Sequence, residues 1–424
     1  MEDYTEIRKI PKGVRVFLPE DTARQAKIEK ILEKAFKRWS FFKISTPVFE
    51  YYNSIKPGWG KLLDRIAYKF TGPGGEMLVL KPDMTAPLAR VVASNFRASE
   101  PPLRLYYMTP VYRFPTDSMV KKSEIYQAGA ELIGVKGPEA DAEIIALAAD
   151  CAKGLNIRNF RIDLSQVGFF SNLLKDLDLS PADIRKIKNF VYKKEEMGLA
   201  NFLREGPLKK SSVEKIIRLT TLYGKHEVLG EASALVSNKD MERDLKNISD
   251  VYSLLAKYGL SESISIDFGL VRGLDYYTGI IFDVFAEGLG AAVISGGRYD
   301  NLIKKYGYDT PATGFALDIG LVLDFFSSSA AGFSGERTDY LVIDAGVGAG
   351  EAISITMKLR DSGYMVEAGM VDRDREGHIA YAKGRHIKNV IFLEPSIYPK
   401  QAYFHSTDSG GGSCKSLKEV FDRE

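Results

Sequence analysis

Two stretches of strand-forming residues, 103–107 and 125–133, are separated by a loop that begins at a proline. Pro115 interrupts the first stretch because its ring removes a backbone donor, and the loop runs to Lys122. The pattern predicts a long hairpin of two antiparallel strands. A chain with such a hairpin builds a mixed or antiparallel sheet, which excludes a regular series of parallel strands and crossover helices.

The remaining elements follow in irregular order. Apolar residues recur every three or four positions in residues 22–39, which predicts an amphipathic helix. Helices are also expected at 139–153 and at 315–326, and strands at 41–49 (around Pro47), 77–80, 160–164, 264–268 and 280–285. This mixture predicts an α+β fold, in which helices flank the main sheet.

Changes of composition along the chain indicate its domains. Residues 170–256 are rich in Lys, Glu and Leu and predict a helical insertion between two strands of the main sheet. Small residues at 327–332 indicate a linker, which we extend to residue 337. We therefore expect a core over 1–326 and a small α/β domain with a partly parallel sheet over 338–424.

Composition excludes several classes of protein. Hydrophobic residues make up 45% and charged residues 27% of the 424 residues, which is typical of a globular protein. No apolar run approaches the ~20 residues of a membrane span, and the first residues lack a signal pattern, so we expect a cytoplasmic protein without membrane contact. A net charge of +2 gives no strong footprint for nucleic acid. Cys151, Cys414 and the four histidines show no disulfide or metal spacing, so no metal or cofactor is expected.

The segment 270–279 combines residue types that suit a small polar ligand. Arg272 stands among glycines between two predicted strands and is followed by Asp275, Tyr276 and Tyr277. An arginine fork pairs with carboxylates or phosphates, and tyrosine offers a stacking face and a hydroxyl. The segment therefore predicts a site for a ligand such as an amino acid. A structural ion pair between Arg272 and Asp275 is the alternative.

Three further segments carry similar combinations, namely residues 80–90, residues 110–134 and residues 295–300. In order and spacing over residues 5–325, the four segments resemble the histidyl-tRNA synthetase group of class II aminoacyl-tRNA synthetases. Residues 272–277 and 296–300 resemble the two histidine-binding signatures of that group. The resemblance implies a class II synthetase fold, a C-terminal domain like an anticodon-binding domain, and a homodimer that Pro47 faces.

The resemblance also implies which residues form a histidine pocket. They are Asp83, Thr85, Arg113, Gln127, Glu131, Arg272, Tyr276, Tyr277 and Tyr299. Asp83 would pair with the ligand ammonium, and Arg272 with its carboxylate. Other roles stay open: helix capping for Asp83, a buried polar network for Gln127 and Glu131, and sheet stabilisation for Arg113.

The positions that would bind ATP depart from the synthetase pattern. Pro115 stands where the group has an adenine-reading glutamate, and Lys121 and Lys122 occupy a loop where it has arginines. Gly320 and Leu321 stand where motif 3 has an acid and an ATP-binding arginine. Since a leucine cannot hold a phosphate, we expect adenylation chemistry to be absent and expect no catalytic residue.

A pocket that keeps the synthetase residues but lacks the catalytic cations resembles that of the regulatory subunits of ATP phosphoribosyltransferase. That resemblance implies a non-catalytic partner of a short-form catalytic subunit, which it activates and to which it transmits histidine feedback, without tRNA. An active histidyl-tRNA synthetase and a synthetase-like protein that binds an amino acid or RNA are the alternatives. The domain at 338–424, which many such regulatory subunits lack, favours these alternatives.

Charged residues gather in the C-terminal domain, where His378 and His386 lie near Arg373, Arg375 and Arg385 in the sequence. This pattern indicates a charged surface, and contact with RNA or an acidic protein is the alternative.

Overall fold

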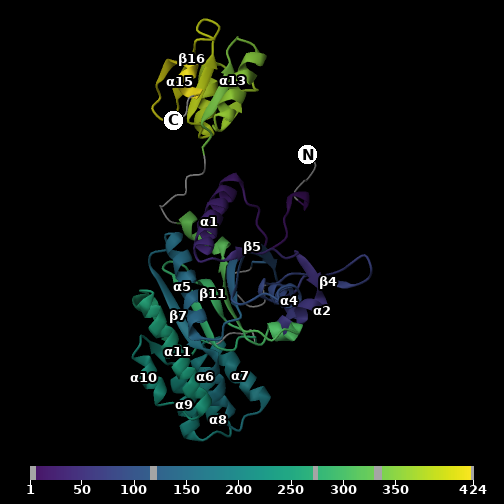
Figure 1. Cartoon of the computed structure of the whole chain (residues 1–424), viewed down its shortest axis with the longest axis vertical. Coiled ribbons are helices and arrows are strands. Elements are labelled where there is room, and N and C mark those ends of the chain that lie inside the picture. Colours follow the sequence, from purple (N-terminus) through teal and green to yellow (C-terminus); the bar gives the residue numbers. More distant parts are fainter. Residues whose placement is uncertain (1–5, 115–121, 271–275, 329–336, 422–424) are drawn as a thin grey trace. The chain divides into compact units, whose positions relative to one another are not determined.

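The computed structural model describes residues 6–114, 122–270, 276–328 and 337–421. The chain divides into two compact units, Met1–Gly332 and Phe333–Glu424. Figure 1 shows the elements of both units. In the described ranges, none of the helices combines the length and the apolar character that crossing a membrane requires.

A nine-stranded sheet forms the centre of the first unit, in the order β1-β5-β6-β12-β11-β10-β7-β9-β8. Its strands are β1 (Phe42–Lys43), β5 (Leu103–Tyr112), β6 (Glu124–Ile133), β7 (Phe160–Gln166), β8 (Tyr223–Gly224), β9 (Ile264–Asp267), β10 (Ile280–Ala286), β11 (Ala292–Arg298) and β12 (Ala312–Asp318). The predicted hairpin is β5 paired with β6, in the register Leu103↔Ile133 to Tyr112↔Glu124.

The pairing in this sheet follows from the connections between strands. Neighbours from β5 through β6, β12, β11 and β10 to β7 are antiparallel, whereas β1 pairs with β5 and β7 pairs with β9 in parallel. A parallel pair needs a long crossover, and the helical insertion supplies it between β7 and β9. The expected α+β fold is confirmed, with a sheet that is mixed at its two ends.

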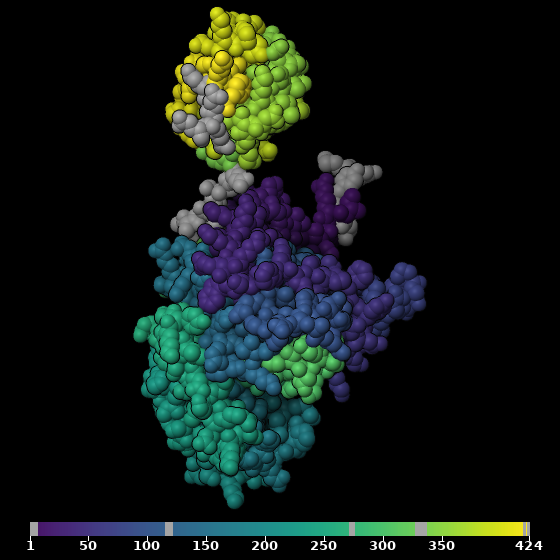
Figure 2. Space-filling view, viewed as in Figure 1, coloured from purple at the N-terminus to yellow at the C-terminus, as the bar shows by residue number. Residues whose placement is uncertain are grey.

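The insertion is mainly helical and also contributes strand β8 to the sheet. Its helices are α6 (Val167–Lys175), α7 (Pro181–Tyr192), α8 (Glu196–Glu205), α9 (Lys210–Thr220), α10 (Val228–Ser233) and α11 (Lys239–Lys257). Two of them begin at side-chain caps: Ser180 accepts from the Asp183 amide, and Asn238 accepts from the Met241 amide. Figure 2 shows the insertion, in teal, as a continuous lobe of the first unit.

The other helices of this unit flank the sheet. They are α1 (Pro19–Arg38), α2 (Tyr52–Trp59), α3 (Leu63–Ile66), α4 (Thr85–Asn95), α5 (Pro138–Gly154) and α12 (Ile319–Ser328), with short 3-10 turns at Glu6–Arg8, Gly60–Leu62, Ser261–Ser263 and Ile303–Tyr306. A small sheet, β2-β4-β3, joins β2 (Phe49–Tyr51), β4 (Met77–Leu80) and β3 (Lys69–Thr71).

Two predictions from the pattern were wrong in detail. Residues 41–49 do not form one strand: β1 ends at Lys43 and β2 starts at Phe49, because Pro47 between them cannot donate to a ladder. Residues 315–318 belong to strand β12, and the closing helix begins only at Ile319. In a continuous run of apolar residues, periodicity cannot distinguish a buried strand from a buried helix.

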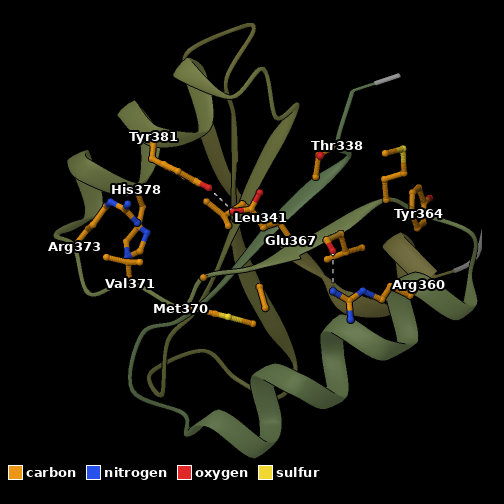
Figure 3. A pocket seen from close by; sticks show the side chains of 14 residues that line it. Thr338, Leu341, Arg360, Tyr364, Glu367, Met370, Val371, Arg373, His378 and Tyr381 are labelled. Atoms are coloured by element: carbon orange, nitrogen blue, oxygen red, sulfur yellow. Dashed lines mark hydrogen bonds between the residues drawn. The ribbon is translucent and has the colours of Figure 1, made fainter. Parts of the chain in front are cut away.

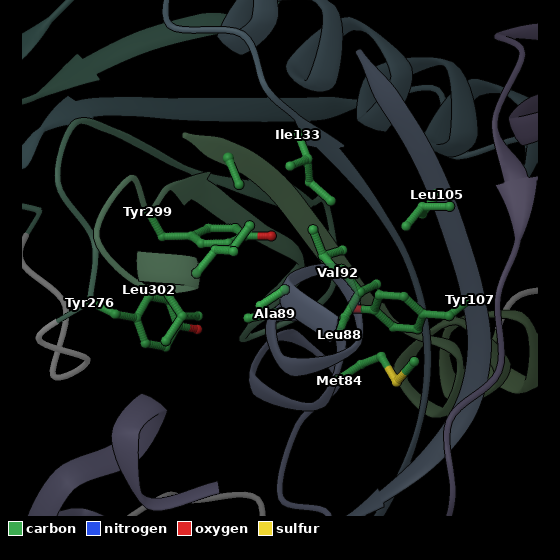
Figure 4. Packing of buried hydrophobic residues seen from close by; sticks show 13 residues of the cluster. Met84, Leu88, Ala89, Val92, Leu105, Tyr107, Ile133, Tyr276, Tyr299 and Leu302 are labelled. Carbon is green, nitrogen blue, oxygen red and sulfur yellow. The ribbon is translucent and has the colours of Figure 1, made fainter. Parts of the chain in front are cut away.

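The core beside the hairpin is formed largely by α4. Met84, Leu88 and Val92 pack against Leu105 of β5 and Ile133 of β6 (Figure 4). The same cluster includes three tyrosines: Tyr107, Tyr276 and Tyr299. Aromatic rings with a polar end can belong to a core and still present a hydroxyl to a cavity.

The second unit is an α/β domain with a five-stranded sheet in the order β14-β13-β15-β16-β17. Its elements are β13 (Tyr340–Asp344), α13 (Ala349–Asp361), β14 (Val366–Ala368), α14 (Arg375–Gly384), β15 (Asn389–Leu393), β16 (Gln401–Ser406), β17 (Gly412–Ser416) and α15 (Leu417–Phe421). β13 is parallel to both β14 and β15, while β16 and β17 are antiparallel additions. The expected partly parallel sheet is therefore present.

Candidate ligand-binding site

A cavity of about 130 Å³ lies in the first unit at the hairpin. Its wall comes from α2, the start of α4, the strands β5, β6, β11 and β12, and the residues before β10. The lining residues are Trp59, Asp83, Thr85, Tyr107, Arg113, Gln127, Glu131, Tyr276, Tyr277, Ser295, Gly297, Tyr299, Gly314, Phe315 and Ala316. Segments distant in the sequence thus converge on one small, partly aromatic space.

Glu131 is the most deeply buried acid of this cavity, with 2% of its surface exposed. The Tyr299 hydroxyl donates to its Oε2 at 2.6 Å, and the Thr85 hydroxyl donates to its Oε1 at 3.4 Å. Burial raises the pKa of the Glu131 carboxyl to about 8, because these hydrogen bonds only partly offset desolvation and nearby Asp83 adds repulsion. The carboxyl is therefore mostly protonated near neutral pH in the empty cavity.

Asp83 uses one carboxylate oxygen to hold the start of α4 and keeps the other unpaired. Its Oδ1 accepts from the Ala86 amide at 3.3 Å, so the capping role exists. Its buried Oδ2 has no hydrogen-bond partner among the described residues, and burial raises the pKa of this carboxyl. The Trp59 indole opposes that shift, but its own N–H lacks a partner in the same residue ranges. An unpaired buried oxygen is costly and is best satisfied by a donor in the cavity.

Two more polar side chains are similarly placed. Gln127 Oε1 and Arg113 Nε are buried without a hydrogen-bond partner in the described ranges. The Arg113 guanidinium lies close enough to lower the pKa values of Asp83 and Tyr107, although burial raises both of them overall. The cavity therefore offers several acceptors and one cation, a combination that suits a small ligand with both an ammonium and a carboxylate.

Tyrosine rings form the apolar side of the cavity. Tyr276 lies 4.7 Å from the Tyr277 ring and 6.0 Å from the Tyr299 ring, measured between centroids. Burial raises the pKa values of Tyr276 and Tyr299 well above the ordinary range, so both hydroxyls stay protonated. A planar ligand ring can pack against one of these tyrosine rings while the hydroxyls fix its orientation.

Gly314 shows why the cavity exists at this point of β12. A Cβ placed there would lie 1.6 Å from Glu131 Oε2, because Gly314 pairs directly with Glu131 across the ladder. Any larger residue would displace the carboxyl.

Eight of the nine residues predicted for the pocket line this one cavity: Asp83, Thr85, Arg113, Gln127, Glu131, Tyr276, Tyr277 and Tyr299. The ninth, Arg272, lies outside the described residues, as does Pro115. Sequence reasoning missed Trp59 and Tyr107. Tyr107 shares a strand face with Arg113 by alternation, whereas nothing local to Trp59 indicates its position.

The arginine of the second signature has a structural role. Arg298 is buried and its Nε donates to Asp141 Oδ2 at 2.9 Å, while its other nitrogens reach Asp300 and the Val135 and Gly137 carbonyls. Its neighbour Tyr299 points into the cavity instead. The signature therefore combines one structural residue with one lining residue.

The motif 3 region holds an ion-pair network. Lys122 Nζ lies 3.7 Å from Asp318 and 3.4 Å from Asp324, and Arg15 also contacts Asp324 at 3.1 Å. Asp318 in addition accepts from the Leu321 amide at 3.1 Å. The lysine nearest to this region is thus already neutralised by two carboxylates.

Among the residues whose placement is described, no group of three or more His, Cys, Asp or Glu side chains could hold a metal ion.

Comparison with known proteins identifies relatives over nearly the whole chain. A family model described as histidyl-tRNA synthetase matches residues 13–322. A protein of Geobacter sulfurreducens named ATP phosphoribosyltransferase regulatory subunit is 34% identical over 97% of this chain and 94% of its own length. One of the same name from Acetivibrio thermocellus is 32% identical over 97% of both chains. Because these matches include the C-terminal residues, the second domain does not argue against that family.

Solved structures agree in fold. A structure from Bacillus halodurans, described as an ATP phosphoribosyltransferase regulatory subunit/histidyl-tRNA synthetase, is 30% identical with a TM-score of 0.81, covering 92% of this chain and 98% of its own. A histidyl-tRNA synthetase from Nostoc has the same TM-score at 19% identity, covering 97% and 98%, and supports the fold alone.

Proposed function

The chain belongs to the family of ATP phosphoribosyltransferase regulatory subunits, and on this premise we propose that it is the regulatory subunit of a hetero-oligomeric ATP phosphoribosyltransferase and binds histidine in the cavity at Glu131. The partner is a short-form catalytic subunit that joins ATP to phosphoribosyl pyrophosphate. The chain activates this partner and transmits histidine feedback to it.

The observation that carries the proposal is the unpaired polar lining of a partly enclosed aromatic cavity. Asp83 Oδ2 and Gln127 Oε1 are buried acceptors without partners in the described ranges. Histidine brings an ammonium for Asp83 and a planar imidazole with two nitrogens for Glu131 and the tyrosines. The ligand would thereby satisfy atoms that the protein alone leaves unsatisfied.

Absence of synthetase chemistry is the second part of the proposal. Adenylation needs fixed cations around the ATP phosphates. Leu321 provides none, and Lys122 is engaged by Asp318 and Asp324. A chain that holds an amino acid without activating it is suited to sensing that amino acid.

Feedback requires that histidine bind two states of the assembly with different affinity. The cavity is lined by residues from the hairpin, α4 and the strands β11 and β12, so its occupancy can bias how these elements pack. Such a bias can reach a partner that contacts the same unit.

We also propose a homodimer through the region of Pro47. Large side chains are exposed there on β1, β2, β3 and β4 and just before β2, namely Phe42, Val48, Phe49, Tyr51, Phe70 and Met77. The Phe49 and Phe70 rings meet edge to face at 5.9 Å. A patch of this kind is typical of a surface that a protein partner covers. Light scattering of the purified chain measures its molar mass and thereby distinguishes a dimer from a monomer.

Reconstitution with the short-form catalytic subunit of the same organism tests the function. We expect product formation from ATP and phosphoribosyl pyrophosphate to rise when the chain is added and to fall when histidine is added. The Glu131→Gln variant should keep the activation and respond to histidine only at higher concentration, while the exposed Glu205→Gln variant should behave as the unmodified chain does. No activation by the unmodified chain would contradict the proposal.

Histidine-dependent ATP–pyrophosphate exchange distinguishes the alternative synthetase. We expect no exchange above background, measured beside a competent histidyl-tRNA synthetase. Robust exchange would mean that the ATP site works despite Leu321, and would replace the regulatory proposal with the synthetase.

A further inference from the structure

The C-terminal domain carries a groove along the edge of its sheet, with a volume of about 560 Å³. It is lined by the consecutive residues from Tyr364 to Val371, together with Thr338, Leu341, Arg360, Arg373, His378 and Tyr381. Figure 3 shows Arg360 and Tyr364 on one side of the strand and Arg373 and His378 on the other. A continuous run of lining residues indicates an elongated groove that follows the strand.

The strand in question, β14, is at the edge of the sheet and pairs with β13. Met365 accepts from the Tyr340 amide and Gly369 donates to the Val342 carbonyl, so these residues face β13. By alternation, the backbone groups of Val366 and Ala368 face outward. An edge strand of this kind is a template for a further strand.

Both faces of the sheet contribute to the groove. α13 packs on the face of Val342 and Ile391, whereas α14 packs on the face of Leu341 and Val390. Arg360 comes from α13, and His378 and Tyr381 come from α14. The groove therefore wraps around the edge of β14, where an added strand would lie between the two helices.

The surface around the edge is apolar and adaptable. Met370 is 91% exposed, and Met365 and Val371 are also exposed. Methionine side chains adjust to different apolar partners, and they recur at surfaces that bind protein segments. An extended chain could place every second side chain against them.

The arginines of the groove favour an acidic partner. The Arg373 guanidinium stacks on the Tyr381 ring at 4.4 Å, and Arg360 donates to the Val366 carbonyl at 3.0 Å. Neither arginine forms a salt bridge to a carboxylate within the described residues. Glu367, the acid of the lining, already accepts from the Tyr381 hydroxyl at 2.5 Å.

A buried polar side chain completes this side of the groove. His378 is 5% exposed, so the expected surface histidine is instead buried, and its Nδ1 has no hydrogen-bond partner in the part of the chain that the structure describes. Within the described residues, the groove thus adds an unpartnered ring nitrogen to its two arginines.

We propose that this groove binds an extended, acidic segment of a partner protein, which adds a strand to β14 and places its carboxylates at Arg360 and Arg373. The segment's alternate apolar side chains pack on Met365, Met370 and Val371. This site is separate from the cavity at Glu131 and does not depend on the function proposed for it.

Selection from a phage-displayed library of random twelve-residue peptides on the full chain tests the proposal. We expect enrichment of acidic sequences with alternating apolar residues. Arg360→Glu and Arg373→Glu should each weaken an enriched peptide about tenfold, as expected for reversing a charge at an interface. The exposed Lys400→Glu variant, outside the groove, is the matched control and should bind unchanged.

Amide hydrogen exchange supplies a second readout. The bound peptide should slow exchange at Val366 and Ala368 in the unmodified chain, which a contact elsewhere would not do. Failure to enrich any peptide, enrichment of basic sequences, or binding that survives both arginine reversals would overturn the proposal.

Discussion

The Tyr299 hydroxyl donates a 2.6 Å hydrogen bond to Glu131 Oε2 inside the cavity. Strands on the two sides of β12 bring the residues together, since Tyr299 follows β11 and Glu131 lies on β6. This bond orients a carboxyl that burial holds mostly protonated, and its consequences for binding and stability can be measured.

Histidine binding should release protons at pH 7. The Glu131 carboxyl has a pKa of about 8 in the empty cavity, so it carries a proton there. The ammonium of bound histidine, at Asp83 in the same cavity, stabilises the ionised form of Glu131, lowers its pKa and expels the proton. Affinity should therefore rise from pH 6.5 to pH 8 and then level off. Calorimetry in buffers of different ionisation enthalpy counts the protons. Glu131→Gln should abolish the release that belongs to this group, and proton uptake by the unmodified chain would contradict the assignment.

The same carboxyl should make the unliganded protein less stable as pH rises. Its pKa is raised from 4.5 to about 8 on folding, so the folded state keeps a proton that the unfolded state gives up. The contribution of this carboxyl to the free energy of unfolding is fully present below pH 4.5 and is lost as pH rises through 8. Each unit of pKa difference between the folded and unfolded states corresponds to at most about 1.4 kcal/mol. Relative to the unmodified chain, Glu131→Gln should therefore gain stability between pH 5.5 and pH 8.5. Thermal unfolding of both proteins at pH 5.5 and pH 8.5 measures this gain. If the difference in stability between the two proteins is the same at both pH values, the pKa of Glu131 is not raised.

Removing the Tyr299 hydroxyl should cost stability and binding together. Tyr299→Phe leaves Glu131 with only the longer bond from Thr85, and the loss of a buried hydrogen bond costs about 1–3 kcal/mol. Denaturant unfolding and histidine titration check both effects. Tyr192→Phe, at an exposed tyrosine, is the control and should be neutral. A variant with normal stability and affinity would show that the bond does not matter.

Arg298 should matter for folding more than for the ligand. Arg298→Ala leaves the buried Asp141 carboxyl without its cationic partner. Burial raises the pKa of Asp141 to about 6 even beside the arginine. Breaking such a buried pair costs about 3–5 kcal/mol of stability. The exposed pair of Lys246 and Asp250 provides the contrast, and Lys246→Ala should cost less than about 1 kcal/mol. Equal losses of stability in the two variants would contradict the structural role of Arg298.

Local patterns were enough to predict much of the fold. The hairpin of β5 and β6 follows from alternation around a proline, and the insertion and the C-terminal α/β domain follow from composition and spacing. Resemblance of short motifs brought Asp83, Glu131 and Tyr299 into one expected site, and these residues do line one cavity. Such signals depend on residues that are close together in the sequence, so they can be recognised without knowledge of the fold.

Tertiary structure decided which of these residues face the cavity and in which protonation state. Arg298 and Tyr299 are neighbours in one motif, yet the first is tied to Asp141 and the second opens into the cavity. Trp59 joins the wall from a distant helix, and His378 is buried beside a groove that no local pattern revealed. The proton on Glu131 likewise depends on desolvation by strands and helices far apart in the chain. The sequence alone determines residue types and local periods, whereas burial and electrostatic environment are created only when distant segments meet.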